Sequence, residues 1–244
     1  MNIDPLDCDE RLLDDSYRRE YLMRLLACGA LGLLPARLAS AGWFSSDPEK
    51  LADDQSIHSL EGSAWVNGET ADLKTRIRAG DRVETGADSE IIFAVGGDSF
   101  ILRSDSRMDI EGGNFLVQGL RLLSGSLLSV FAPRAADEPL IVGAPTATIG
   151  IRGTGVYLEA EPELTYVCTC YGEVALASNL DADDAELIAT TNHDMPRYVA
   201  SKAVKGTRIR PAPVINHSNA ELKLLEAIVG REPPKGFGAK GYTK

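Results

Sequence analysis

Gly143-Ala-Pro-Thr-Ala-Thr-Ile-Gly-Ile-Arg-Gly-Thr-Gly-Val-Tyr157 is the stretch that decides the fold of this chain. It predicts one strand over residues 146–151 and a second over residues 156–160, with a Gly-Thr-Gly corner between them. The glycines of this stretch let the backbone turn with positive φ, or approach another backbone where a Cβ atom would clash. We therefore expect two β-strands that meet at a tight corner.

Arg152 lies inside this corner. A charged residue enclosed by glycines either pairs with a buried carbonyl or carboxylate, or is displayed to a partner, because a buried charge persists only when it is paired. Both roles stay open from the sequence. If the corner is displayed, Arg152 and Thr154 are the residues that we expect to contact a protein partner.

Short apolar segments separated by turn residues continue on both sides of the corner. Residues 89–95 and 99–102, which a Gly-Gly-Asp turn joins, predict a β-hairpin. Turn signals recur about every 8–12 residues, which is typical of an all-β sandwich or barrel. The same rhythm also fits a short β-solenoid of many short strands.

One α-helix is predicted, near the C-terminus. Ser218-Asn-Ala-Glu221 is a capping box, in which the first and last side chains each bond to the backbone of the other. Gly230 supplies a stop signal at the far end. The apolar stripe between them consists of Leu222, Leu225, Ile228 and Val229. We expect this helix to pack on an end or a face of the β-sheets.

Several motifs resemble those of FecR-domain proteins. Residues 146–154 are similar to the family signature TPTATVGVRGT. Further similar elements are the Gly-Asp turn and strand at residues 77–86, the hairpin at 89–102, the strand start at 122–127 and the closing strand at 171–174. Their common order and spacing extend the resemblance over about residues 61–176.

This resemblance implies a non-catalytic periplasmic module for binding or signalling, which acts through protein–protein interaction in the cell envelope. Regulator-type members of the family lie in the inner membrane, where their cytoplasmic end controls a sigma factor. This chain has only a short apolar run in place of a permanent span. We therefore expect an exported form without the sigma-regulator cytoplasmic domain, with a protein partner and no permanent membrane span in the mature chain.

The N-terminal segment predicts export. Ser16-Tyr-Arg-Arg-Glu-Tyr-Leu-Met23 resembles a twin-arginine motif. The apolar run at residues 25–34 is shorter than the roughly 20 residues of a transmembrane helix. Ala39-Ser-Ala41 is typical of signal peptidase sites, so we expect cleavage near Ala41 and a periplasmic or secreted chain that starts at Gly42. The alternative is a buried or amphipathic N-terminal helix.

The chain is therefore expected to divide into five parts. These are a signal peptide at residues 1–41, a linker at 42–60, the FecR-like β domain at 61–176, a β extension with the capping helix at 177–230, and a disordered tail at 231–244. The acidic run Asp181-Ala-Asp-Asp-Ala-Glu186 lies in the extension. It lacks the internal glycine of a calcium loop, so we expect a solvated acidic turn there.

Composition argues against two function classes. The 244 residues are 44% apolar, which is enough for one core of ordinary size plus appendages. A formal charge of −11, without a basic patch that contains aromatic residues, is poorly suited to a phosphate backbone, so we expect no nucleic-acid partner. The sequence has no nucleophile elbow, phosphate loop or dinucleotide fingerprint, so we expect no enzyme activity.

Cys168 and Cys170 are the chemically suggestive pair. They lie two residues apart on a predicted strand, which puts them on one face with Cβ atoms roughly 6.5–7 Å apart. A disulfide needs roughly 3.5–4.5 Å, whereas two thiolates can share a metal ion about 2.3 Å from each sulfur. Loops that contain His193 and His217 can return beside this strand. A zinc or copper site formed by these four residues is therefore a testable hypothesis.

Other interpretations stay open from the sequence. The cysteines also fit a redox role, a buried pair of thiols or a strained disulfide, and the histidines fit hydrogen-bonding loop residues. A further alternative is a glycan-binding protein of the cell envelope, in which exposed Trp65 or Tyr157 would stack on a sugar. Both aromatic residues also fit a role in the core.

Overall fold

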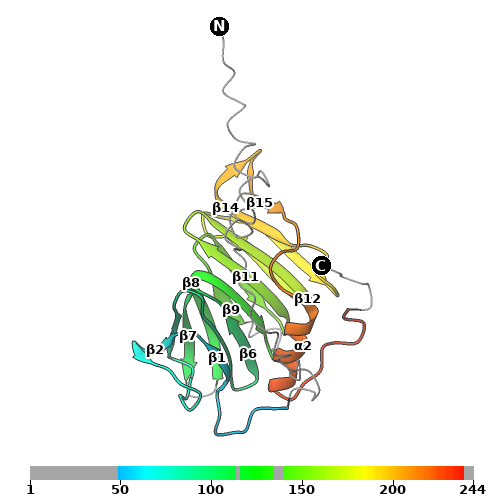
Figure 1. Ribbon diagram of the computed structural model, residues 1–244. Helices are drawn as coiled ribbons and strands as arrows, with labels where there is room; N and C mark the ends of the chain where they lie inside the picture. Colours follow the sequence, from blue (N-terminus) through cyan, green and yellow to red (C-terminus); the bar gives the residue numbers. More distant parts are fainter. Residues whose placement is uncertain (1–48, 114–115, 135–139, 239–244) are drawn as a thin grey trace, which may run out of the picture. The chain divides into compact units, whose positions relative to one another are not determined.

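The computed structural model describes residues 49–113, 116–134 and 140–238, and in these ranges the chain forms 15 β-strands and one α-helix (Figure 1). The described chain is therefore all-β with a single short helix near the C-terminus, as the sequence predicts. The predicted signal peptide and the last residues of the predicted tail lie outside the described residues.

The strands form two sheets that share two long members, β8 and β12. Sheet A has the order β1 (Ile57–Glu61), β5 (Glu90–Val95), β6 (Asp98–Leu102), β8 (Leu116–Val130), β11 (Gly155–Glu161), β12 (Leu164–Ser178), β14 (Arg197–Val204) and β15 (Thr207–Pro211). Sheet B has the order β3 (Glu69–Thr70), β2 (Ala64–Val66), β4 (Arg82–Thr85), β7 (Arg107–Gly113), β8, β9 (Leu140–Gly143), β10 (Ala147–Ile151), β12 and β13 (Asp181–Thr190). Only β8 and β9 pair in parallel within the described chain.

β8 and β12 each pass from one sheet to the other at a glycine. In β8, Ser124 pairs with β7 of sheet B and Gly125 pairs with β11 of sheet A. In β12, Tyr171 pairs with β11 of sheet A and Gly172 pairs with β13 of sheet B. Both glycines have positive φ, which allows a sharp bend that other residues rarely adopt. Each glycine therefore bends one continuous strand and does not end it.

The main core lies between the two sheets and contains inward-facing residues of both. The predicted corner contributes two residues from each of its strands, and all four are completely buried: Ile149, Ile151, Val156 and Leu158. Because side chains alternate along a strand, the residues between them point to the outer faces. On sheet A, the outward-pointing residues form one side of a second core.

Residues 212–238, called here the C-terminal cap, cover the outer face of sheet A. They include helix α2 (Asn219–Ile228), which packs against β6 and β8 (Figure 1). The second core contains Leu222, Leu225 and Ile228 of the helix, and Ile101, Leu128, Tyr157, Tyr166, Cys168 and Cys170 of the sheet. The apolar stripe of the predicted helix is therefore the face that meets the sheet.

Helix α2 begins at the predicted capping box. The backbone N–H of Glu221 donates to the Ser218 hydroxyl, and the backbone N–H of Ser218 donates to the Glu221 carboxylate at 2.7 Å. The same carboxylate pairs with Arg103 at 2.6 Å, and the hydroxyl of Ser99 donates to the carbonyl of Leu225 at 2.7 Å. These polar contacts fix the helix on sheet A.

Two predicted boundaries differ from the structure at the ends of the β domain. The predicted linker at residues 42–60 contains most of β1, which pairs with β5. Residues 231–238, predicted as part of a disordered tail, belong to the cap. Phe237 packs against Tyr171 with ring centroids 4.9 Å apart, and this aromatic contact gives the segment a defined position.

The acidic run at residues 181–186 is also different from its prediction, because it is part of strand β13 and not a turn. β13 pairs with β12, which supplies the backbone hydrogen bonds of a strand. Asp184 accepts hydrogen bonds from the hydroxyl of Thr207 and the backbone N–H of Arg208. The neighbouring strand β15 therefore provides donors that hold an acidic segment in a sheet.

Candidate metal centre

Cys168 and Cys170 lie on β12, where side chains alternate between the two faces of sheet A. Val167 points into the core between the sheets, whereas the two cysteines point outward beneath the C-terminal cap. Both cysteines are completely buried and both are free thiols. The strand therefore presents two sulfur atoms on one face, as their spacing predicts, and no disulfide joins them.

His193 reaches the cysteines from the turn that follows β13. Its backbone N–H donates to the carbonyl of Cys170 at 3.0 Å. Its φ of 57° lies in the left-handed region, which residues other than glycine adopt rarely. This turn directs the imidazole back toward β12, so that Nδ1 lies 3.6 Å from the Sγ atom of Cys168. The histidine is buried there, 2% exposed.

His217 comes from the loop between β15 and α2, within the C-terminal cap. Its ring stacks on Tyr157, with centroids 4.6 Å apart and planes inclined by 22°. The neighbouring Asn216 donates to the carboxylate of Glu159 at 2.7 Å, which anchors the loop on β11. The Nε2 atom of His217 thereby lies 2.9 Å from the Nδ1 atom of His193.

The four predicted ligands converge on one buried place. The two sulfur atoms and one ring nitrogen of each histidine all lie within 4.8 Å of one another. A single tetrahedral ion, with bonds of about 2.3 Å to sulfur and about 2.0–2.1 Å to nitrogen, requires separations of about 3.3–3.8 Å. The observed 3.6 Å between sulfur and nitrogen agrees with this, whereas the 2.9 Å between the nitrogens is about 0.4 Å too short and the four donors together span up to 4.8 Å, so the side chains must shift by up to about 1 Å to bind one ion.

Second contacts of both imidazoles fix which ring nitrogen carries a proton. The Nδ1 atom of His217 lies 2.6 Å from the carbonyl of Ile215, which only accepts, so Nδ1 carries the proton and Nε2 a lone pair. The Nε2 atom of His193 lies 2.8 Å from the side-chain oxygen of Asn219, so its Nδ1 atom carries the lone pair. While both imidazoles are neutral, two lone pairs therefore face each other at 2.9 Å beside the sulfur of Cys168, and a shared proton or a metal ion makes this contact favourable.

The cluster favours a thiolate at Cys168. The pKa of this thiol is lowered to about 4, first by a hydrogen bond from Cys170 and then by hydrogen bonds that the imidazoles donate when they are protonated. Burial, together with the hydrogen bond to Cys168, raises the pKa of Cys170. Burial lowers the pKa of His193, but hydrogen bonds with Cys168 and Asn219 outweigh it and the net shift is upward. One sulfur thus attracts cations and the other retains its proton.

This arrangement provides four donors and no exposed position. The four residues are at most 2% exposed, and aromatic side chains such as Tyr157 and Phe237 pack against the two imidazoles. Structural zinc sites use four protein ligands, whereas catalytic ones keep a position for water or substrate. The geometry is therefore that of a closed site, in which an ion would hold chain segments together.

The structure separates the two corner residues that the sequence names as interaction candidates. Arg152 is half-exposed and pairs with Glu173 of β12 at 3.1 Å. Thr154 is completely buried, and its methyl group lies close to Gly172. Its side chain does not reach the surface, so we remove Thr154 from the candidate interaction surface. Tyr157 is buried as well and is not available to a sugar.

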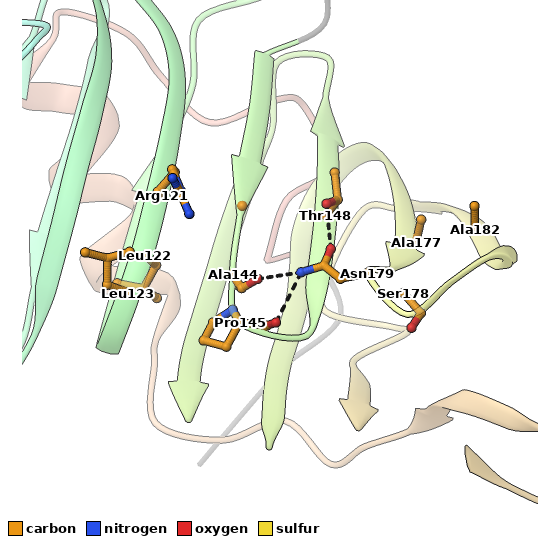
Figure 2. Close-up of a pocket in the computed structure, with 11 residues that line it drawn as sticks. Arg121, Leu122, Leu123, Ala144, Pro145, Thr148, Ala177, Ser178, Asn179 and Ala182 are labelled. Atoms are coloured by element: carbon orange, nitrogen blue, oxygen red, sulfur yellow. Dashed lines mark hydrogen bonds between the residues drawn. The ribbon is translucent and has the colours of Figure 1, made fainter. Parts of the chain in front are cut away.

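A surface depression on sheet B is lined by residues other than the four candidate ligands (Figure 2). Asn179 closes one side, because it accepts from the hydroxyl of Thr148 at 2.7 Å and donates to the carbonyl of Ala144 at 2.8 Å. Arg121 is the one titratable residue in its lining. A single guanidinium does not form an acid–base pair, so this depression offers no catalytic constellation.

Two contributors to the cluster are not predicted from the sequence. Asn219 belongs to the Ser-Asn-Ala-Glu capping box and is there an ordinary first helical residue, yet its side chain orients His193. The carbonyl of Ile215 orients His217 in the same way. The only sequence signal for Asn219 is its position, two residues after the candidate ligand His217 and at the start of the predicted helix.

Comparison with known proteins assigns no family to the chain. No protein-family model matches it, and no curated protein matches it significantly. Two crystal structures of a proposed anti-sigma factor from Parabacteroides distasonis are similar, each with a TM-score of 0.42 and 15% identity over 54% of this chain. The chain matches 58% of that protein's length. Such a likeness assigns neither activity nor residue roles.

Within the described residues, no helix has the length and hydropathy of a membrane span.

Proposed function

We propose that this chain is a non-catalytic metal-binding protein that holds one zinc ion through Cys168, Cys170, His193 and His217. The observation that carries the proposal is the convergence of two sulfur atoms and two imidazole nitrogens within 4.8 Å of one another, all on completely buried side chains. Two lone pairs at this distance repel unless a cation lies against both. A proton can satisfy the two nitrogens alone, whereas a metal ion satisfies all four donors at once.

Charge favours a divalent ion over monovalent copper. Two thiolates and two neutral imidazoles carry two negative charges, which Zn²⁺ cancels and Cu⁺ leaves half uncompensated. A net charge in a completely buried site is costly unless it is paired. Arg103 is the nearby cation, and it is already paired with the carboxylate of Glu221. It therefore does not supply a positive charge that would compensate the site. Zinc also accepts sulfur and imidazole nitrogen in the tetrahedral geometry that the donors approach.

The direct test is metal analysis of the purified chain with a matched histidine control. We expect one zinc ion per wild-type chain, and an affinity loss beyond about 100-fold when a ligand such as Cys168 or His217 is changed to Ala, because even indirect partners of a ligand account for about 10–100-fold. His58→Ala is the control, since His58 lies on β1 outside the cluster. A wild-type chain that binds no metal refutes the site, and one that binds copper refutes the charge argument.

A second candidate function is protein binding in the cell envelope, with export by a twin-arginine signal peptide that is cleaved near Ala41. What supports it is the resemblance of the sequence motifs, together with an apolar row on the outer face of sheet B. Leu187, Ala175, Gly150 and Ile141 are successive partners across four strands, and Leu187 and Ile141 are 66% and 43% exposed. Large apolar side chains on a flat, exposed sheet are typical of interaction surfaces.

Two measurements test this second candidate. The intact mass of protein from the periplasm should correspond to a chain that starts at Gly42, and a cytoplasmic, uncleaved chain would contradict export. A photo-crosslinking residue at position 187 should give a discrete adduct with a protein in living cells. The matched control is position 204, since Val204 is 42% exposed but lies on β14 of sheet A. Equal labelling from both positions would refute the surface.

A further inference from the structure

The donors of the proposed site are divided between two parts of the chain. Cys168, Cys170 and His193 belong to β12 and to the turn after β13, whereas His217 belongs to the C-terminal cap. Asn219, which orients His193, is the first residue of helix α2 in the same cap. The four-ligand site is therefore complete only while the cap lies on sheet A.

The cap depends on this contact because its own structure is short. Helix α2 has 10 residues, and an isolated helix of that length is marginal in water. Its stability must come from the sheet, through buried Leu222, Leu225 and Ile228 and through a few hydrogen bonds. One of these joins the hydroxyl of Tyr166 to the carbonyl of Pro213 at 2.9 Å, just before the ligand loop.

A metal ion replaces a shared proton as the link between the cap and the strands at His217. Without an ion, the lone pair of its Nε2 atom faces the lone pair of His193, and a proton must be bound to relieve the repulsion. With an ion, the same two nitrogens are joined through two metal–ligand bonds. The free energy of metal binding is then also free energy of cap docking, since the site does not exist while the cap is detached.

We infer that the metal ion is a latch that keeps residues 212–238 on sheet A, and that loss of the ion releases them and uncovers the outer face of the sheet. This inference rests on the proposed zinc site. The face beneath the cap contains Tyr157 and Tyr166, together with the two cysteines. Because linkage is reciprocal, a metal ion that favours the docked cap binds more tightly when the cap is docked, so a variant whose cap is docked for less of the time binds metal more weakly.

Hydrogen exchange of the wild-type chain tests the latch without any substitution. Removal of zinc with a chelator should accelerate exchange of backbone amides in residues 212–238 by about tenfold or more, which is the scale of an ordinary coupling between two sites. The reference is strands β4 and β7, which pair with each other in sheet B, whereas the cap packs on sheet A. Their exchange rates should stay within about twofold.

A substitution far from the donors tests the reverse direction. Leu225 is completely buried in the second core, and Leu225→Ala removes contacts of the helix without touching a ligand. We expect a zinc affinity that is lower by about tenfold, since truncation of a buried leucine weakens packing substantially. Leu120→Ala is the matched control, because Leu120 is equally buried but lies in the core between the sheets. It should change zinc affinity by less than about twofold.

Three outcomes would overturn the latch. These are unchanged exchange in the cap after zinc removal, equal acceleration in the cap and in sheet B, and equal zinc affinities of the wild-type chain and a folded Leu225→Ala variant. Each leaves the zinc site itself intact, because zinc still binds to the wild-type chain. A wild-type chain that binds no zinc would refute the proposed site instead, so the two failures are distinguishable.

Discussion

Asn219→Ala should weaken zinc binding although Asn219 is not itself a ligand. The side-chain oxygen of Asn219 lies 2.8 Å from the Nε2 atom of His193, which is 2% exposed. Alanine would leave a buried N–H group without its acceptor, at a cost of about 1–3 kcal/mol. An affinity loss of about 10–100-fold, the range for partners that orient a metal-bound histidine, corresponds to about 1.4–2.8 kcal/mol. The cost of the unpaired N–H group and the expected loss of zinc affinity are therefore of the same size.

Asn219→Asp provides the matched variant for this prediction. A carboxylate keeps the acceptor in place, and its negative charge at the first position of α2 is favourable near a helix N-terminus. Its zinc affinity should therefore equal or exceed that of the wild-type chain. Helix capping is intact in both variants, because the cap residue is Ser218 and its partner is Glu221.

The assay is competition for zinc with a chromophoric chelator, with circular dichroism to confirm folding. Asn179→Ala serves as the remote control, since Asn179 bonds to Thr148 and the nearby turn on sheet B. If Asn219→Ala and Asn219→Asp bind zinc equally well, and as tightly as the wild-type chain, the assignment of the two lone pairs is refuted.

Two further predictions concern the strand bend and the protons of the site. Gly172→Ala should lower the free energy of unfolding by about 2–4 kcal/mol in urea denaturation, because the new Cβ would lie 2.4 Å from the side chain of Thr154 at a φ of +92°. Gly206→Ala, at a φ of +91° with open space around it, should cost only about 1–2 kcal/mol, and equal losses would contradict the steric argument. Zinc affinity should fall as pH falls, by about tenfold per pH unit for each displaced proton, because burial raises the pKa of Cys170 and this thiol must lose its proton to bind metal. Competition titrations between pH 6 and 8 check the slope, and a flat profile would exclude Cys170 as a ligand.

Local patterns predict the helix and most strands of this chain because their signals are short-range. The hydroxyl of Ser218 and the carboxylate of Glu221 make the capping box regardless of what the helix contacts. The same holds for the hairpin of β5 and β6, whose turn residues are adjacent. At Gly125 and Gly172 the local signal is ambiguous, because positive φ serves equally to end a strand and to bend one. Only pairing with different strands on the two sides decides it.

The candidate site could be predicted in part for a similar reason. The alternation of a strand places Cys168 and Cys170 on one face, and the predicted loops allow His193 and His217 to return to that face. The role of Asn219 could not be predicted, because it requires the position of α2 on sheet A and the rotamer of one side chain. Such long-range placement is not encoded in spacing. The left-handed backbone at His193 could not be predicted from spacing either.

A merely structural role for the four residues is the main alternative, and the local energetics argue against it. A buried pair of thiols on a core strand is compatible with β12 alone. It does not require two imidazoles in the same pocket, which must leave water and there oppose lone pair to lone pair. Aliphatic side chains at these positions would fill the space without either cost. A cation that binds all four donors compensates for the lost hydration of the imidazoles and for the repulsion between their lone pairs. It also joins the cap to sheet A at the place where the two imidazoles meet.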